Sequence, residues 1–170
     1  FVSENGDDQN DGATPRTAWR SLAKATAALK AGATVYVMPG RYHENLVIEG
    51  KDFEGGNPAS IRIRGKGVAV VGNGQSPALK VIGSRNIIIK GLTFDNAKGS
   101  MVKDSRGIAL RHLFFKDGPL TVADSIWIGM ENCTFAAPKD GPIQRASSLS
   151  LEKCGPVILR NSLFTGPRHC

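Results

Sequence analysis

Four phenylalanines recur along the second half of the chain, and each one ends a similar segment of eight residues. An aliphatic residue stands seven positions before each Phe, and successive Phe residues are 21, 20 and 29 positions apart. Self-similarity at a period of about 20 to 50 residues is typical of solenoids, in which each repeat packs on its neighbours. We therefore expect the four rings to stack inside a coil. The segments are IIIKGLTF (87–94), IALRHLFF (108–115), IGMENCTF (128–135) and VILRNSLF (157–164).

A second apolar pair precedes three of the four segments, eight residues before the aliphatic anchor. In the second repeat this pair is irregular, with Met101 and Val102. A coil of about 20 residues accommodates three short strands and three turns, at roughly 3.3 Å per strand residue. Each repeat therefore predicts one turn of an all-β coil with parallel strands. The regular pairs are Leu79 and Val81, Leu120 and Val122, and Leu149 and Leu151.

The position three before each Phe is occupied by Gly91, His112, Asn132 or Asn161. Gly, Asn and His tolerate a left-handed backbone best, so we predict a tight turn at this position. The alternation of side chains along a strand places Cys133, two before its Phe, on the inward side of the coil. Its simplest role is that of a small core residue.

The position four before each Phe faces outward and predicts a surface ladder with about 4.8 Å between its steps. Two interpretations stay open. A structural ladder in which Glu131 neutralises its neighbours is favoured, because exposed ion pairs on sheets are common and weak. The alternative is a stripe that reads a substrate. The ladder consists of Lys90, Arg111, Glu131 and Arg160.

The N-terminal part of the chain lacks the repeat. Thr14 and Pro15 predict the start of a helix, because the hydroxyl caps it and proline sets φ at the first helical position. Apolar residues at steps of three and four continue to about Ala31, which indicates one short amphipathic helix. From Thr34 onward, period-two alternation of β-branched residues predicts short strands instead.

The length of 170 residues suits one domain with its own core. We expect a single β-helix domain over residues 1–170, with a loop and the helix in residues 1–33 and the rungs in residues 34–170. Strand edges that are left open at the end of a coil need a cover. We therefore expect the coil to be truncated or to continue, with further protein or a partner chain at its C-terminal end.

The net charge of +7 makes a polyanionic partner plausible, whether an acidic polysaccharide, a nucleic acid or an anionic membrane surface. A solvated basic surface explains the same charge. No apolar run approaches the roughly 20 residues that span a bilayer, and no signal peptide is present, so we expect no membrane span. Cys133, Cys154 and Cys170 lack the spacing of a zinc site, and their odd number says nothing of the compartment.

The whole chain resembles the pectate-lyase-like superfamily of right-handed parallel β-helices. The resemblance implies an all-β, right-handed parallel β-helix with a short N-terminal capping α-helix, and an extracellular or cell-surface location. Lyases, hydrolases, epimerases, esterases, tailspikes and other surface proteins share that architecture, so the fold does not choose among them. The resemblance rests on FVSENGDDQNDG, PRTAWRSLAKA, TVYVMPGRYHENLVIEG, GNPASIRIRGKG and the four Phe-anchored segments.

Catalytic motifs of the superfamily's enzymes have no clear counterpart here. VYVMPGRYHENLVI also resembles the opening strand of pectin methylesterases, but the Gln, two Asp and Arg of that family have no matching motif. The aspartates of the turns are scattered, so they do not form the acid and base cluster of a polygalacturonase-type hydrolase. In lyase families, a Lys or Arg removes the proton α to a uronate carboxylate while calcium or another cation neutralises that carboxylate.

The longest turn, residues 136–148, is our preferred binding site, because solenoids place binding residues on long turns of a rigid coil. Lys139 and Arg145 lie in it, and Lys103 and Lys116 in earlier turns extend a basic groove beside it. For each of these residues taken singly, a solvated turn charge is the slightly favoured alternative. None of the histidines is assigned to catalysis. The N-terminal loop offers a calcium site, for which carboxylates are suitable ligands: Asp7, Asp8 and Asp11.

Two hypotheses of function follow from the sequence. The first is an extracellular β-helix that binds an acidic polysaccharide and, in its complete form, cleaves it by β-elimination, with calcium as the one cofactor considered. The second is a non-catalytic structural or adhesive cell-surface module in a larger assembly, favoured by the lack of a catalytic cluster.

Overall fold

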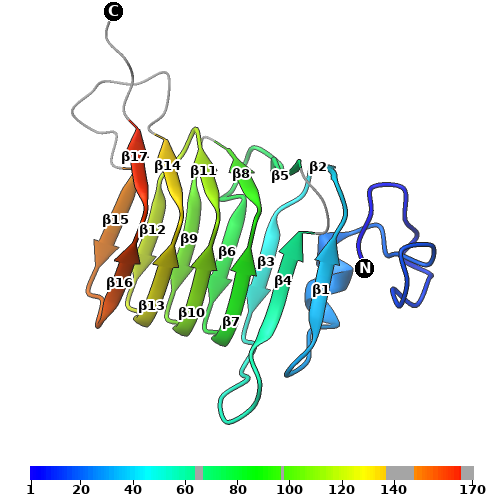
Figure 1. The fold of residues 1–170 in the computed structure, drawn as a ribbon, viewed down its shortest axis with the longest axis horizontal. Helices are drawn as coiled ribbons and strands as arrows, with labels where there is room; N and C mark the ends of the chain where they lie inside the picture. The colour runs from blue at the N-terminus through cyan, green and yellow to red at the C-terminus, as the bar shows by residue number, and fades with distance from the viewer. Residues whose placement is uncertain (64–66, 97, 137–147, 166–170) are drawn as a thin grey trace, which may run out of the picture.

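The computed structural model describes residues 1–63, 67–96, 98–136 and 148–165. In this part of the chain, seventeen short strands wind into a parallel solenoid, and one short helix packs beside its N-terminal end (Figure 1). The strands make five complete turns and the first two strands of a sixth. The described part contains no helix that is long and apolar enough to cross a bilayer.

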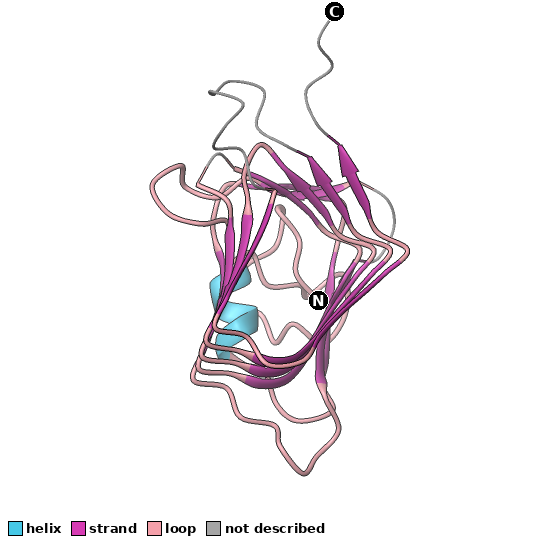
Figure 2. Cartoon of the chain, turned by 90° about the vertical axis from the view of Figure 1, so that its left-hand side faces the viewer, coloured by secondary structure: helices cyan, strands magenta, loops and turns pink. Residues whose placement is uncertain are grey.

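Each turn of the chain visits three sheets in the same order, and the view along the coil shows the three walls (Figure 2). Sheet A contains β1 (Thr34–Val37), β4 (Ala59–Ile63), β7 (Arg85–Lys90), β10 (Arg106–Arg111), β13 (Ile126–Glu131) and β16 (Val157–Arg160). Sheet B contains β2 (Gly40–Tyr42), β5 (Val68–Val70), β8 (Thr93–Asp95), β11 (Phe114–Lys116), β14 (Thr134–Ala136) and β17 (Leu163–Thr165). Sheet C contains β3 (Leu46–Glu49), β6 (Leu79–Ile82), β9 (Ser100–Lys103), β12 (Leu120–Ala123) and β15 (Leu149–Glu152). The predicted parallel β-helix is confirmed, and its right-handed sense stays a prediction.

The predicted stack of phenylalanines is present in sheet B. Ring centroids are 5.5 Å apart for Phe94 and Phe115, 5.2 Å for Phe115 and Phe135, and 5.0 Å for Phe135 and Phe164. The first three rings are fully buried. The longer interval before the fourth ring falls between β14 and β15, so the added residues leave the pairing of the following strands unchanged.

The register of sheet C explains why the second repeat is irregular. Ser100, not Met101, pairs with Leu79 and Leu120, and Val102 lines up with the inward-facing valines of its neighbours. Ser100 is buried and Met101 is half-buried. The predicted irregularity is confirmed, because a small polar residue, Ser100, occupies the inward position that holds leucine in the neighbouring turns.

The predicted left-handed turn column is confirmed, with φ of 84° at Gly91, 52° at His112, 53° at Asn132 and 46° at Asn161. Cys133 is buried as predicted. Burial raises the pKa of its thiol.

Buried serines fix the corner between sheets C and A. The backbone N–H of Ser84 donates to Oγ of Ser105 at 3.2 Å, and the N–H of Ser105 donates to Oγ of Ser125 at 3.1 Å. Each hydroxyl in turn donates to a backbone carbonyl two residues earlier. Because buried polar groups need partners, this ladder locks the start of each sheet A strand to the next.

The helix is shorter than predicted. Helix α1 spans Leu22–Ala27, with Ser21 as its N-cap, whose hydroxyl accepts a hydrogen bond from the N–H of Lys24 at 3.0 Å. The start at Thr14 was wrong, because the hydroxyls of Thr14 and Thr17 bond to each other and to each other's backbone N–H and close a local turn. The helix packs against β3 at the N-terminal end of the coil (Figure 1).

The C-terminal end of the coil exposes apolar side chains at inward-facing positions, among them Leu151, Leu159 and Phe164. Corresponding positions of the inner turns are covered by the next turn. Further protein or a partner chain at this end stays a prediction.

Candidate functional site

The outer face of sheet A carries the surface ladder, which is longer than the sequence predicted. The expected order of Lys90, Arg111, Glu131 and Arg160 is confirmed by the strand register. On the N-terminal side, Arg62 pairs with Lys90 and extends the ladder. Four cations and one acid therefore stand in one straight column.

The next outward column of the same face is small only at two neighbouring turns. From turn to turn it consists of Ser60, Ile88, Ala109, Gly129 and Ile158. Ala109 pairs with Gly129, and a Cβ placed on Gly129 would meet nothing within 4 Å. The ladder therefore borders a shallow groove over Ala109 and Gly129, with Ile88 and Ile158 at its two ends. A hollow of about 220 Å³ over this column includes Arg111 and Glu131 in its lining, and one of about 380 Å³ is lined by Arg62, Lys90, Gly91 and His112.

The second rim of the groove lies at the start of the sheet A strands. Arg85 and Arg106 pair across β7 and β10, and the carboxylate of Glu54 contacts both guanidinium groups. Trp127 follows in the next turn, where it lines a hollow of about 360 Å³ together with both arginines.

Ion pairs within the ladder leave much of its charge available. Nε of Arg111 lies 3.6 Å from a carboxylate oxygen of Glu131, and both side chains are about half exposed. Exposed pairs of this kind contribute less than about 1 kcal/mol, so an incoming anion can compete with Glu131. Nε of Arg62 is shielded from solvent and has no hydrogen-bond partner among the described residues.

The structure does not bring together the two predicted basic residues that it describes. Lys103 ends β9, at the corner between sheets C and A, whereas Lys116 ends β11, at the corner between sheets B and C. Nζ of Lys116 is 3.0 Å from Asp95 and 3.8 Å from Asp117. The hydrogen bond to Asp95 raises the pKa of Lys116. Its charge is thus committed to neighbouring acids. Lys139 and Arg145 lie outside the described residues.

The carboxylates of the N-terminal loop accept hydrogen bonds from groups within the N-terminal part of the chain. Asp8 accepts hydrogen bonds from the backbone N–H groups of Arg20 and Ser21 and from the Ser21 hydroxyl, and these lower its pKa. Asp7 and Asp11 each accept from a backbone N–H two residues later. No group of three or more potential metal ligands occurs in the described ranges. Calcium binding by Asp7, Asp8 and Asp11 stays a prediction.

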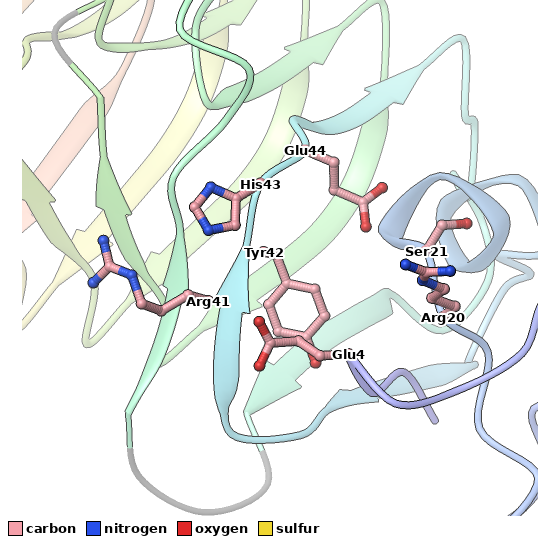
Figure 3. A pocket seen from close by; sticks show the side chains of 7 residues that line it. All are labelled: Glu4, Arg20, Ser21, Arg41, Tyr42, His43 and Glu44. Carbon is pink, nitrogen blue, oxygen red and sulfur yellow. The ribbon is translucent and has the colours of Figure 1, made fainter.

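A polar hollow of about 330 Å³ opens where the N-terminal segment, the helix and β2 meet (Figure 3). Glu44 accepts hydrogen bonds from the N–H groups of Leu22 at 2.8 Å and Ala23 at 3.3 Å, so it ties the first turn of α1 to the coil. The hydroxyl of Tyr42 donates to the carbonyl oxygens of Met38 and Val2. These contacts give the hollow a structural role at the N-terminal end of the coil.

Raising the pH should destabilise the protein through Tyr42. Burial, with the carboxylates of Glu4 and Glu44 nearby, raises the pKa of Tyr42 to about 12 from 10.0. The contribution of Tyr42 is therefore complete below pH 10 and is lost as the pH rises through about 12. We expect the urea midpoint to fall over this window, and Tyr42→Phe to remove that part of the decline. Tyr36→Phe is the control, since the chain has two tyrosines, and an identical decline in both variants would contradict the assignment.

Part of this face of sheet A was predicted from the sequence. The ladder of Lys90, Arg111, Glu131 and Arg160 was predicted, but a structural role was favoured over a binding role. Arg62 was missed because Val70, not a Phe, occupies the aromatic position of its turn. A signal for the second rim was available, since Arg85 and Arg106 occupy one position two residues before the aliphatic anchor.

Fold and face together define a class: a parallel β-solenoid with a cationic groove over one sheet. No family model matches the chain. It is 32% identical over 103 residues to the uncharacterized protein YwoF of Bacillus subtilis (strain 168), a match of 56% of this chain and 22% of YwoF. The chain therefore spans about a fifth of that relative.

A solved structure shares the fold. The GH136 lacto-N-biosidase of Eubacterium ramulus superposes with a TM-score of 0.61 at 13% identity, over 95% of this chain and 42% of the enzyme. A rhamnogalacturonan lyase gives a TM-score of 0.44 at 12% identity, over 96% of this chain and 67% of the lyase. At 13% identity the likeness to the lacto-N-biosidase shows the fold alone.

Proposed function

We propose that this chain binds an acidic polysaccharide along the outer face of sheet A. The observation that carries the proposal is the column of four cations on this face, which borders the shallow groove over Ala109 and Gly129. Neighbouring rungs are about 4.8 Å apart, a distance comparable to the length of one sugar unit in an extended chain. A polysaccharide that lies along the groove would thus present its acidic groups to successive cations.

The chemistry of the ladder fits carboxylate or sulfate groups. Arginine presents a planar fork of donors that suits both anions, and three of the four cations are arginines: Arg62, Arg111 and Arg160. The fold similarity to a carbohydrate-active enzyme is compatible with this use. Because such polysaccharides occur in cell walls and matrices, we also propose an extracellular or cell-surface location.

Removal of the two central cations tests the proposal. We expect Lys90→Gln with Arg111→Gln to weaken binding of polygalacturonate by roughly 5- to 30-fold, since each exposed ion pair contributes up to about 1 kcal/mol. Isothermal titration calorimetry at low salt measures the affinity. Raising the salt to about 1 M should abolish binding by the unmodified protein, because the Debye length falls to roughly 3 Å.

The matched control is Lys30→Gln with Lys98→Gln. It removes the same charge from exposed positions outside sheet A. Equal weakening by the two double variants would show that net charge alone attracts the polymer. Unchanged binding in the ladder variant would exclude the groove, and a lack of binding by the unmodified protein would favour the structural or adhesive module.

Cleavage by β-elimination is a second proposal, favoured by the position of Lys90 between Arg62 and Arg111 in the ladder. Lys90, as an uncharged amine, would take the proton from the carbon that bears the uronate carboxylate. The electron pair of that bond would form a carbon–carbon double bond as the bond to the leaving sugar oxygen breaks, and water would protonate this oxygen. The flanking arginines would neutralise the carboxylate. The test is the ultraviolet absorbance of unsaturated uronate, which should appear with the unmodified protein and be absent with Lys90→Ala.

A further inference from the structure

Trp127 is an exposed indole held in an unusual backbone conformation. Its side chain is 55% exposed. Its φ is 57°, in a column whose other members are Asn86 at 59° and Gly107 at 65°. Asn and Gly adopt this conformation readily, whereas a bulky residue does so only under strain. Strained residues that persist on a surface often belong to a binding site.

The hollow beside Trp127 has room for a ring. A Cβ placed on Gly107 would touch only backbone atoms of Asn86, at 3.6 and 3.7 Å, so the side toward Trp127 is open. The amide of Asn86 is held by the carbonyl oxygens of Phe53 and Gly56, at 3.1 and 3.0 Å. One wall is therefore fixed, the floor lacks a side chain, and the indole borders the remaining side.

The charge of this hollow is balanced, unlike that of the ladder. Glu54 pairs with both Arg85 and Arg106, at 3.5 Å from the latter, and Asp52 lies 3.7 Å from Arg85. Two guanidinium groups thus face two carboxylates. The rim offers donors and acceptors side by side, which suits hydroxyl groups better than it suits an additional anion.

We propose that the Trp127 hollow binds an uncharged pyranose ring. The ring would stack on the indole, which is an amphipathic platform, while its hydroxyl groups bond to Glu54 and Arg106. The inference rests on the proposed function, because it places this ring on the rim of the groove that holds the acidic sugars. The ligand is then a heteropolysaccharide that carries both acidic and neutral units.

The experiment titrates the protein with methyl galactoside, methyl glucoside and methyl rhamnoside and follows tryptophan fluorescence. The other tryptophan, Trp19, donates from its indole nitrogen to the Asn10 carbonyl in the N-terminal loop. A saturable change that is lost in Trp127→Ala therefore reports Trp127. We expect millimolar binding of at least one glycoside that is unchanged at about 1 M salt. Trp127→Ala should weaken it at least tenfold by calorimetry, and Trp127→Tyr should retain part of the affinity.

Glu54→Gln supplies a second test that does not remove the indole. The variant removes the negative charge that pairs with Arg85 and Arg106 and one of the acceptors for sugar hydroxyl groups. Glycoside binding should therefore weaken at least threefold, whereas binding of the anionic polygalacturonate should strengthen. Circular dichroism verifies that each variant is folded.

The inference is overturned if no glycoside binds, if Trp127→Ala binds as well as the unmodified protein, if salt abolishes glycoside binding, or if Trp127→Ala instead changes the protein's self-association. Loss of polygalacturonate binding alone would overturn the proposed function and leave the neutral site standing.

Discussion

Replacing Phe115 by alanine should lower the free energy of unfolding by about 3 to 5 kcal/mol, the range for truncating a buried aromatic residue. Phe115 is 1% exposed and lies between two parallel rings, Phe94 and Phe135. The two flanking turns cannot close the resulting gap without breaking the register of sheet B. Urea denaturation monitored by circular dichroism measures the loss.

Phe114 provides the control, since it has the same side chain one position earlier on the same strand. It points outward and is 38% exposed. Phe114→Ala should cost less than about 1.5 kcal/mol, because little apolar area is returned to water. Equal losses at the two positions would contradict an interior stack.

Replacing Gly99 by alanine should cost about 2 to 4 kcal/mol. Its φ of 73° disfavours any L side chain by roughly 1 to 2 kcal/mol. The added Cβ would also press against the carbonyl oxygen of Pro119 in the next turn, well inside van der Waals contact. The carbonyl group of Pro119 belongs to the backbone and cannot move aside as the end of a flexible side chain does. The cost of this close packing therefore adds to the cost of the left-handed backbone conformation.

Gly74→Ala separates the two contributions. Gly74 has the same φ of 73°, but its Cβ would meet nothing within 4 Å. It should therefore show the conformational cost alone, about 1 to 2 kcal/mol, in the same urea experiment. If both alanine variants lose the same stability, close approach of the turns at Gly99 has no energetic weight.

The solenoid could be predicted because several columns of residues show its periodicity independently. The Phe column, the outward charges and the left-handed turn residues all repeat at one spacing, and a period-two strand fixes which of them face inward. The start of the helix could not be found from local signals. Thr14 and Pro15 form a sound capping pattern, but Ser21 has the additional support of Asp8 and Glu44, which are distant in sequence.

The groove was harder to predict, because it depends on which corner each turn residue occupies. Lys103 and Lys116 are close in sequence and both basic, yet they sit at different corners of the coil. Arg62 and Lys90 are 28 positions apart but adjacent in the sheet. Their adjacency follows from the strand register of a turn that has no phenylalanine, so the Phe-anchored repeat did not reveal it.

The preserved pairing of β13 with β16 across a longer interval has a consequence for design. Strand register survives extra residues at a corner, so a whole turn can in principle be duplicated without disturbing its neighbours. Each duplicated turn would lengthen the proposed binding face by one step. If the proposed function holds, the length of the oligosaccharide that the protein prefers would increase with the number of turns.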